Sequence, residues 1–568
     1  MANTALLRPL GVILALIGGC AAGLADEPPV YPQGAVAADH PLASAAGVAI
    51  LQRGGNVIDA AVATAVTLSV VRPASSGLGG GGFLVFWDAE KQQPFAYDYR
   101  ERAPQAATAD MYANDSADAS RHGAKAIAVP GEIVGLCEIQ AKHGMLTLAD
   151  VLEPALQLAR DGFAIDVHEG EIQQSLLREF AKHQEYTERY AALWRGYLNS
   201  GQPWREGDRF FSPQRPALEL LAKEGAAAFT AGELGRAIVA EIQQRGGIVE
   251  VADLQAMSPV AREPLRIRFR DYDVITMPPP SSGGVSLIQV VQMLEAWSRK
   301  RGHAPYEKLP EADRAHVLVE AFKHAFANRA EYLGDADFET VPLKLLLSPD
   351  YAGYLANKID LTKTFPPEHY GRNLVGDDGG TSHFCVMDAR GNAVACTETI
   401  NLTYGSYVVE PKFGIVLNNE MDDFTAQPGK PNAFGLRQSA ANAVAPGKKP
   451  LSSMTPTIVL KDGRPVLIVG ASGGPRIISA TTQVLLNVLL LGDSANAAVQ
   501  RPRLHHQWLP DEIAIEARLH RDLASALGAK GHTLRESREL GVSQAIHWTA
   551  AGIEPASDPR KHGRPAGY

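Results

Sequence analysis

Residues 376–388 read GDDGGTSHFCVMD, and at this stretch the predicted secondary structure changes from mostly helices to mostly strands. Residues 359–380, which lead into it, are polar and carry no periodic pattern, which is typical of a linker or an exposed excursion. Short apolar or alternating segments follow it and predict strands at 384–387, 393–399, 415–417, 457–460 and 466–469. A helix is expected to close this pattern at 477–491.

The chain upstream of this stretch is mostly helical by its apolar spacing. A glycine loop at 75–82 leads into a predicted strand at 83–87. Helices, then strands, then helices favour an α+β fold with layered sheets over alternating βαβ units. The predicted helices cover 42–71 (with a break at 54–55), most of 140–260, 285–297 and 312–332.

The centre of the opening stretch, Gly379-Gly380-Thr381, also suggests chemistry. Two glycines allow strained backbone geometry before a hydroxyl residue, which can attack its own preceding carbonyl and split the chain. The new N-terminal threonine would carry an α-amino group with a pKa of ~7.7 to 8.0, able to act as general base for its own hydroxyl. Gly-Gly-Thr also occurs in plain loops, so this motif is not decisive by itself.

Length and composition limit the number of domains, the class of protein and the kind of partner that we expect. The 568 residues predict three or four domains of ordinary size. Hydrophobic residues at 45% and charged residues at 21% exclude the disordered and fibrous classes. A formal charge of −9 gives no electrostatic reason to expect nucleic acid or an anionic membrane as partner, so a small-molecule substrate is expected.

The N-terminus has the features of a secretory signal over residues 1–25. Its apolar run is too short to span a membrane, and no later segment is apolar for long enough. We expect an exported protein, periplasmic or secreted, cleaved after Ala25 or alternatively lipid-anchored at Cys20. Cleavage after Ala25 leaves an odd set of cysteines, so buried free thiols are favoured over a disulfide between Cys385 and Cys396.

Several common sites are excluded by context. Gly77, Gly79 and Gly82 match a dinucleotide-loop spacing, but the order is helix, loop, strand instead of strand, loop, helix, so no nucleotide cofactor is expected. Instead, the loop is interpreted as a tight backbone passage beneath a site. The adjacent His505 and His506 do not share a face, and no zinc motif occurs, so no metal is expected.

A second glycine loop has a different context. The strand at 466–469 runs into residues 470–475, which read GASGGP, and a helix begins near Arg476. Backbone N–H groups at a helix N-terminus are donors for an anion, so this loop is either an oxyanion site or a plain strand-to-helix turn.

Polar groups recur in three further places. Thr397, Thr399 and Asn401 share one face by their period of two, as catalytic groups or as an exposed polar face. In the acidic run at 418–423, Asp422 and Asp423 diverge, so at most one of them lines a pocket. The run at 98–102 offers a guanidinium, and an arginine with a carboxylate is the pair that recognises a free amino-acid end.

Taken together, these segments resemble the γ-glutamyltranspeptidase (glutathione hydrolase) family of the N-terminal-nucleophile hydrolase superfamily. The resemblance runs over almost the whole mature chain, through long motifs in one order. These are HPLASAAG at 40–47, GGNVIDAAVA at 54–63, SSGLGGGGF at 75–83, YRERAP at 99–104, AVPGE at 128–132, MPPPSSGG at 277–284, LNNEMDDF at 417–424, PLSSMTPT at 450–457 and SDPR at 557–560.

The resemblance implies a four-layer αββα sandwich and autocatalytic cleavage before Thr381. A large subunit, residues 26–380, and a small subunit, residues 381–568, would then form one interleaved heterodimer instead of three or four domains. Thr381 would be both the cleavage and the acyl-transfer nucleophile, supported by Thr399. Gly473 and Gly474 would donate to the oxyanion.

The resemblance also assigns the substrate contacts. The expected substrates are glutathione and other γ-glutamyl compounds, with water, amino acids or dipeptides accepting the γ-glutamyl group from an ester on Thr381. The α-carboxylate would bind Arg100, Ser452 and Ser453, and the α-amino group would bind Asn401, Glu420 and Asp423.

Three positions depart from the family pattern. Residues 425–450 look like the lid loop of some members, but Phe434 stands where several bacterial relatives have tyrosine, which removes a hydroxyl bond to Asn401. Cys385 replaces a usual serine on the strand face of Thr381. Glu420 replaces a glutamine of some bacterial relatives and should favour an ammonium group.

Two rival functions stay open. One is an acylase of the same superfamily that acts on another acyl donor, such as a cephalosporin acylase. The other is an unprocessed, exported protein that binds γ-glutamyl compounds without turnover.

Overall fold

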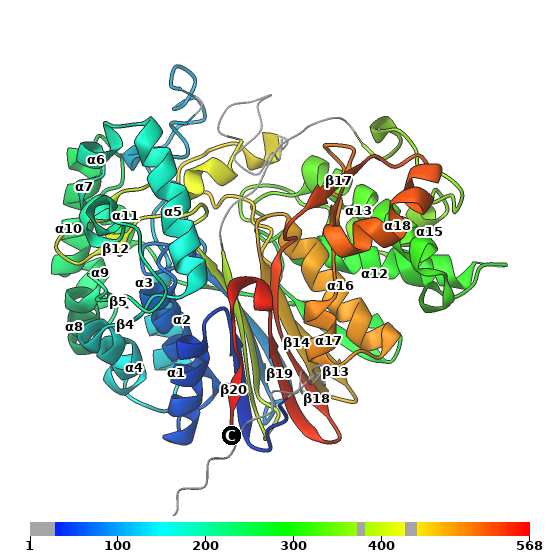
Figure 1. The fold of residues 1–568 in the computed structure, drawn as a ribbon, viewed down its shortest axis with the longest axis horizontal. Coiled ribbons are helices and arrows are strands. Elements are labelled where there is room, and N and C mark those ends of the chain that lie inside the picture. Colours follow the sequence, from blue (N-terminus) through cyan, green and yellow to red (C-terminus); the bar gives the residue numbers. More distant parts are fainter. Residues whose placement is uncertain (1–28, 117, 301, 372–380, 426–439) are drawn as a thin grey trace, which may run out of the picture.

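Two antiparallel sheets lie face to face between two layers of helices (Figure 1). The structure is a computed structural model that describes residues 29–116, 118–300, 302–371, 381–425 and 440–568. This arrangement is the four-layer αββα sandwich that the resemblance implies, so the predicted α+β fold is confirmed.

The first sheet has seven strands and contains the strand that begins directly after Thr381, the expected nucleophile. Strand β9 (Ser382–Asp388) lies in its interior, hydrogen-bonded to β1 on one side and to β10 on the other. The order is β20 (Ala566–Gly567), β1 (Gly34–Ala38), β9, β10 (Ala393–Thr399), β2 (Gly81–Asp88), β3 (Gln93–Asp98) and β6 (Val260–Arg262).

The second sheet has six strands and carries the glycine loop at 470–475. Its longest strand, β14, ends at Ser472, immediately before that loop. The order is β19 (Gly552–Ser557), β18 (Val542–Thr549), β14 (Arg464–Ser472), β13 (Thr457–Lys461), β8 (Tyr272–Thr276) and β7 (Leu265–Phe269).

The strand alternation builds the core in layers. In β2, Phe83, Val85 and Trp87 face the second sheet, whereas Leu84 and Phe86 face the helices. Ile458 and Ile468 of the second sheet also pack in the layer between the two sheets. Each sheet is therefore buried on both faces.

The outer helices are divided between the sheets. Gly47 lets α1 and α2 pack closely, since a Cβ there would lie 2.4 Å from Thr64 Oγ1. The first sheet is covered by α1 (Pro41–Gln52) and α2 (Val57–Val71), with α3 (Glu132–His143), α4 (Leu148–Asp161), α5 (Val167–Lys182), α8 (Arg215–Glu224) and α10 (Glu233–Gln244) beyond them. The second is covered by α12 (Gly283–Arg299), α13 (Glu311–Tyr332), α15 (Pro349–Ala356), α16 (Arg476–Leu491), α17 (Ala495–Gln500) and α18 (Ala517–Ala529).

Both sheets combine strands from before and after residue 380. In the first sheet β9 and β10 lie between β1 and β2, and in the second β13 pairs with β8 on one side and β14 on the other. The two parts of the chain therefore share one core, and the three or four separate domains predicted from length are not present in the described residues.

The predicted elements are found close to their expected bounds. The predicted strand at 393–399 and the helix at 477–491 correspond to β10 and α16. Cys385 and Cys396 are buried free thiols, as expected. Among the described residues we find no helix with the length and apolar character needed to cross a membrane.

Candidate active site

Almost all of the predicted site residues surround one cavity. The cavity lies where the ends of β9, β10 and β14 meet. Of the predicted residues only Gly473 is not in its wall. The wall consists of Arg100, Arg329, Thr381, Thr399, Asn401, Glu420, Asp423, Ser452, Ser453, Met454, Gly474, Pro475 and Ile477.

Thr381 stands immediately before β9, with its hydroxyl facing the end of β10. Its Oγ1 lies 3.2 Å from Thr399 Oγ1, and Thr399 Oγ1 accepts a hydrogen bond of 2.8 Å from the Asn401 backbone N–H. The Asn401 side chain donates to the Asn419 carbonyl at 3.0 Å. Thr399 and Asn401 are buried, so the alternative that they form an exposed polar face is wrong.

Lys561 holds the backbone beside Thr381. Its Nζ donates to the Thr381 carbonyl at 2.6 Å and to Ser472 Oγ at 3.0 Å, and pairs with Asp39 Oδ2 at 3.1 Å. A charge-assisted hydrogen bond of this kind is stronger than a neutral one. Lys561 thereby ties the threonine to the end of β14 and to β1.

The glycine loop after β14 brings its backbone to the same cavity as Thr381. Gly473 and Gly474 have φ angles of 119° and 55°, which side-chain-bearing residues rarely adopt. Pro475 then caps α16, and Gly474 lines the cavity. The loop therefore combines a helix N-terminus with backbone conformations that favour glycine, an arrangement that can present N–H groups to an anion.

The earlier glycine loop has a different role, as expected. A Cβ on Gly79 would lie 2.0 Å from the Val416 carbonyl oxygen, and one on Gly80 would lie 2.0 Å from that of Thr399. These glycines allow the backbone to pass directly beneath β10, which supports the Thr399 side of the cavity.

Arg100 forms the centre of the charged side of the cavity. It follows β3, and its guanidinium donates to Glu420 and to Asp423 Oδ2, the latter at 2.6 Å. Its Nε donates to the Pro450 carbonyl at 3.2 Å. An arginine and two carboxylates thus meet inside the protein, where a zwitterionic ligand can pair with both signs of charge.

Burial governs the ionisation of these groups. Desolvation raises the pKa of Glu420 well above its usual value and also raises that of Asp423, although Arg100 opposes both shifts. The neighbouring carboxylates raise the pKa of Arg100, so it stays charged. Asp422 points elsewhere and accepts from Ser120 Oγ at 2.6 Å, so only Asp423 of the pair lines the cavity, as predicted.

The serine pair lies opposite, next to a second arginine. Arg329 of α13 donates from Nε to Ser282 Oγ at 2.9 Å and from Nη2 to Ser453 Oγ at 3.4 Å. Its buried Nη1 has no hydrogen-bond partner among the described residues. Desolvation lowers the pKa of Arg329 to about 10, which still leaves it charged at neutral pH.

A histidine beneath Thr381 completes the layer under the cavity. His383 Nδ1 lies 2.8 Å from Thr397 Oγ1, and its Nε2 lies 3.4 Å from Cys385 Sγ. Burial lowers the pKa of His383 to about 3, so the ring is neutral. Cys385 therefore contacts His383 in the described structure.

Some predicted features lie outside the described residues. These are Gly379 and Gly380 before the nucleophile, Phe434 and most of the expected lid, Cys20 and the signal segment.

Sequence reasoning missed Lys561, Arg329 and His383. His383 shares the period-two face of Thr381, which was a usable signal. Lys561 follows the SDPR motif directly, but its contact with Thr381 spans 180 residues of sequence. Arg329 lies in a helix with no local feature that marks it as a pocket residue.

Comparison with known proteins agrees with this geometry. The model of the γ-glutamyltranspeptidase family matches residues 43–568. The chain is 37% identical to the glutathione hydrolase proenzyme of Escherichia coli (strain K12), with 99% of this chain and 98% of the relative covered. It is 38% identical to glutathione hydrolase 2 of Arabidopsis thaliana, with 94% of each covered.

Solved structures give the same fold. A cephalosporin acylase from Bacillus halodurans superimposes with a TM-score of 0.85 at 26% identity, over 98% of this chain and 99% of that chain. A γ-glutamyltranspeptidase from Pseudomonas nitroreducens complexed with L-DON aligns with a TM-score of 0.52 at 32% identity, over 63% of this chain and 99% of that chain.

Proposed function

The chain belongs to the γ-glutamyltranspeptidase family, and on that premise we propose that it cleaves the γ-glutamyl amide of glutathione and related compounds. It passes the γ-glutamyl group to water, or to an amino acid or peptide. The observation that carries this proposal is that the Thr381 hydroxyl, the glycine loop and the Arg100–Asp423 pair surround one cavity.

Chain cleavage before Thr381 comes first. The Thr381 hydroxyl attacks the preceding carbonyl carbon, the peptide C–N bond breaks as the acyl group moves to oxygen, and water then hydrolyses the ester. Lys561 and Thr399 hold Thr381 in place for this step. The products are a large chain that ends at residue 380 and a small chain that begins with Thr381.

The charged side of the cavity then holds the substrate. Arg100 binds the α-carboxylate together with Ser452 and Ser453, while Asp423, Glu420 and Asn401 bind the α-ammonium group. Bidentate recognition by arginine fixes the orientation of the γ-amide relative to the threonine.

Acyl transfer uses the new N-terminus. Thr381 Oγ1 attacks the γ-carbonyl carbon and gives its proton to the Thr381 α-amino group, while the Gly473 and Gly474 N–H groups stabilise the oxyanion. The amide C–N bond breaks, and the leaving amine takes the proton. Water or an acceptor amine then attacks the ester, returns a proton to the α-amino group and releases the threonine hydroxyl.

The signal-like pattern of residues 1–25 also supports export before or during maturation. We propose that residues 1–25 direct the precursor to the periplasm or the medium, with Cys20 as an alternative lipid-anchor position. N-terminal sequencing of the large chain distinguishes a start at residue 26 from a blocked cysteine.

The test compares wild type with Thr381→Ala. Wild type should run as two bands on a denaturing gel, the smaller starting at Thr381, and should release p-nitroaniline from γ-glutamyl-p-nitroanilide. Thr381→Ala should stay intact and inactive. The buried Thr482, which bonds only within α16 in the described contacts, is the control, since Thr482→Ala should be cleaved and active.

Other outcomes have definite meanings. A single intact wild-type band would contradict the enzyme proposal and favour a binding protein. Two bands without γ-glutamyl release would favour an acylase with another donor, the rival suggested by the fold match to the cephalosporin acylase. Cleavage of Thr381→Ala would show that the nucleophile is misassigned.

A further inference from the structure

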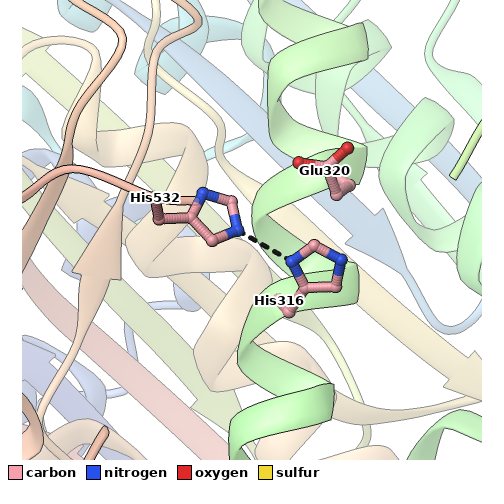
Figure 2. Close-up of side chains that lie close together, drawn as sticks. All are labelled: His316, Glu320 and His532. Atoms are coloured by element: carbon pink, nitrogen blue, oxygen red, sulfur yellow. Dashed lines mark hydrogen bonds between the residues drawn. The ribbon is translucent and has the colours of Figure 1, made fainter. Parts of the chain in front are cut away.

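A second cluster of polar side chains lies on α13, outside the cavity. His316 and Glu320 are four residues apart, so they project from successive turns of the same helix face. His532, in the loop between α18 and β17 (Leu534–Ser537), faces them from the other part of the chain (Figure 2).

The three side chains are close enough to share one ion. One ligand atom from each lies within 4.8 Å of the other two. His316 Nδ1 and His532 Nε2 are 2.7 Å apart (Figure 2). Two nitrogens on one tetrahedral Zn²⁺ are ~3.3 Å apart, because Zn–N bonds are about 2.0–2.1 Å long. The two imidazole nitrogens must therefore separate by about half an ångström for the ion to enter.

The surroundings of His316 orient it as a ligand. Its Nε2 lies 2.7 Å from the Asp360 carbonyl oxygen. A carbonyl only accepts, so Nε2 carries the proton and the Nδ1 lone pair points at His532. A histidine that donates its other ring N–H to a backbone carbonyl is the usual outer arrangement of a metal-binding imidazole.

Glu320 is held in a similar way. Thr364 Oγ1 donates to Glu320 Oε1 at 2.7 Å, and Tyr370 Oη donates to Oε2 at 2.5 Å. These hydroxyls fix the carboxylate and leave further lone pairs on both oxygens, since a carboxylate accepts about four hydrogen bonds.

The charge balance of the neighbourhood leaves room for a cation. Lys323, one turn beyond Glu320, pairs with Asp511 at 2.9 Å and donates to Thr364 Oγ1 at 2.9 Å. His506 lies 3.3 Å from the same Asp511.

We propose that His316, Glu320 and His532 form a site for a zinc-class divalent transition-metal ion, with water in the fourth position. Two imidazoles and one carboxylate are an established donor set for Zn²⁺. His532, at 8% exposure, gives the entry path, whereas His316 and Glu320 are fully buried. The expectation from sequence that the chain binds no metal is thereby revised.

Binding requires one proton to change position. In the described structure His532 Nε2 donates to His316 Nδ1, because that atom carries the lone pair. When the ion enters, the His532 proton moves through solvent from Nε2 to Nδ1, and the freed Nε2 lone pair bonds the metal. No proton is lost from either neutral ring.

The ion would connect residues on the two sides of the cleavage position. His316 and Glu320 precede residue 380 and His532 follows it. In a cleaved molecule the ion would therefore bridge the large and small chains. Its role would be structural and separate from turnover.

The test uses the purified full protein after removal of metals with EDTA. One equivalent of Co²⁺ should give the visible absorption bands of a tetrahedral site, and Zn²⁺ should bleach them. Zn²⁺ should also raise the melting temperature. His532→Gln should weaken Zn²⁺ binding at least about 100-fold, beyond the 10–100-fold typical of outer-shell changes, and should abolish the melting shift.

Two further variants serve as controls for misfolding and for Zn²⁺ binding at other positions. Glu320→Gln keeps the side-chain shape and should also weaken Zn²⁺ binding. His520→Gln, on the surface of α18 and outside the cluster, should bind Zn²⁺ like wild type. Absence of the Co²⁺ bands in wild type, or equal Zn²⁺ affinity in wild type and His532→Gln, would overturn the proposal whether or not the enzyme turns over γ-glutamyl substrates.

Discussion

The half of the cavity around Thr381 presents hydroxyl and amide groups and is held by hydrogen bonds, whereas the half around Arg100 consists of arginine and carboxyl side chains. The hydroxyl half comprises Thr381, Thr399, Asn401 and the Gly473–Gly474 loop, which lie at or next to strand ends. The charged half comprises Arg100, Arg329, Glu420 and Asp423, from three segments far apart in sequence.

The difference separates chemistry from recognition. Strand ends are rigid, so they can hold the proposed nucleophile and the proposed oxyanion donors in fixed positions. Buried charges pay a desolvation cost that is offset only when a partner of opposite sign is present. The hydroxyl half should therefore control chain cleavage and kcat, and the charged half should control substrate affinity.

The strongest challenge to this division is Arg100→Gln. It leaves Glu420 and Asp423 without their cation, and truncation of one partner in a buried charge pair costs ~2–5 kcal/mol. We expect kcat/KM for γ-glutamyl-p-nitroanilide to fall about 10³-fold, mostly through KM, while chain cleavage continues.

The control for this change is Arg262→Gln. Arg262 pairs with Asp98 at 2.8 Å outside the cavity, so its loss should lower stability without raising KM. If Arg100→Gln instead blocked chain cleavage, the separation of the two halves would be wrong.

Gly473→Ala tests the hydroxyl half. A side chain at φ 119° strains the loop and moves its N–H groups, and the loss of an oxyanion donor typically costs 10²–10³-fold in kcat. We expect a fall of about 10²-fold in kcat with KM little changed, measured by steady-state kinetics.

Gly492→Ala is the matched control, because Gly492 has φ 74° at the other end of α16 and open space around it. It should lower the melting temperature and leave kcat unchanged. Equal loss of kcat in both variants would show that backbone strain alone, and not an oxyanion site, explains the effect.

Lys561→Met sharpens the comparison within the hydroxyl half. Lys561 is charged but holds the Thr381 carbonyl, so we expect autocleavage of freshly expressed precursor to slow about 10-fold, consistent with ~1.5 kcal/mol for a bond to a charged group. Time-resolved gels measure this rate.

Lys530→Met provides the comparison, since Lys530 Nζ also bonds a backbone carbonyl, that of Leu361 at 2.6 Å, away from the cavity. A normal rate of autocleavage in both variants would show that Lys561 does not contribute to this step.

The smallest expected effect is on pH dependence. Burial raises the pKa of Asp423, so as pH falls this carboxylate takes up a proton at a higher pH than an ordinary aspartate does. Its neutral form cannot pair with the substrate ammonium, so KM should rise a few-fold on acidification while kcat responds to the Thr381 amino group.

Asp423→Asn should give a high KM without this pH dependence, and Asp422→Asn, whose carboxylate contacts Ser120, should behave like wild type. The same KM–pH curve in Asp423→Asn and wild type would assign the titration to another group.

Sequence patterns predicted the layers better than the contacts between them. Strand β10 was predicted with its observed bounds, because alternation and turn residues are local signals. Contacts between distant segments, such as Lys561 with Thr381 or His316 with His532, depend on how the sheets and helices pack, which no local pattern encodes. The motif resemblance predicted most of the residues that line the cavity. It omitted Arg329, because the helix that contains Arg329 carries no distinguishing motif.

The interior position of β9 has a consequence for renaturation. In a chain cut before Thr381, β9 stays paired with β1 and β10. The two fragments of a native molecule therefore stay associated although the peptide bond before Thr381 is broken. After denaturation the two fragments must find each other in solution, and recovery becomes second order in protein concentration. Uncut precursor refolds as one chain, so the rate of its productive refolding step should not depend on protein concentration.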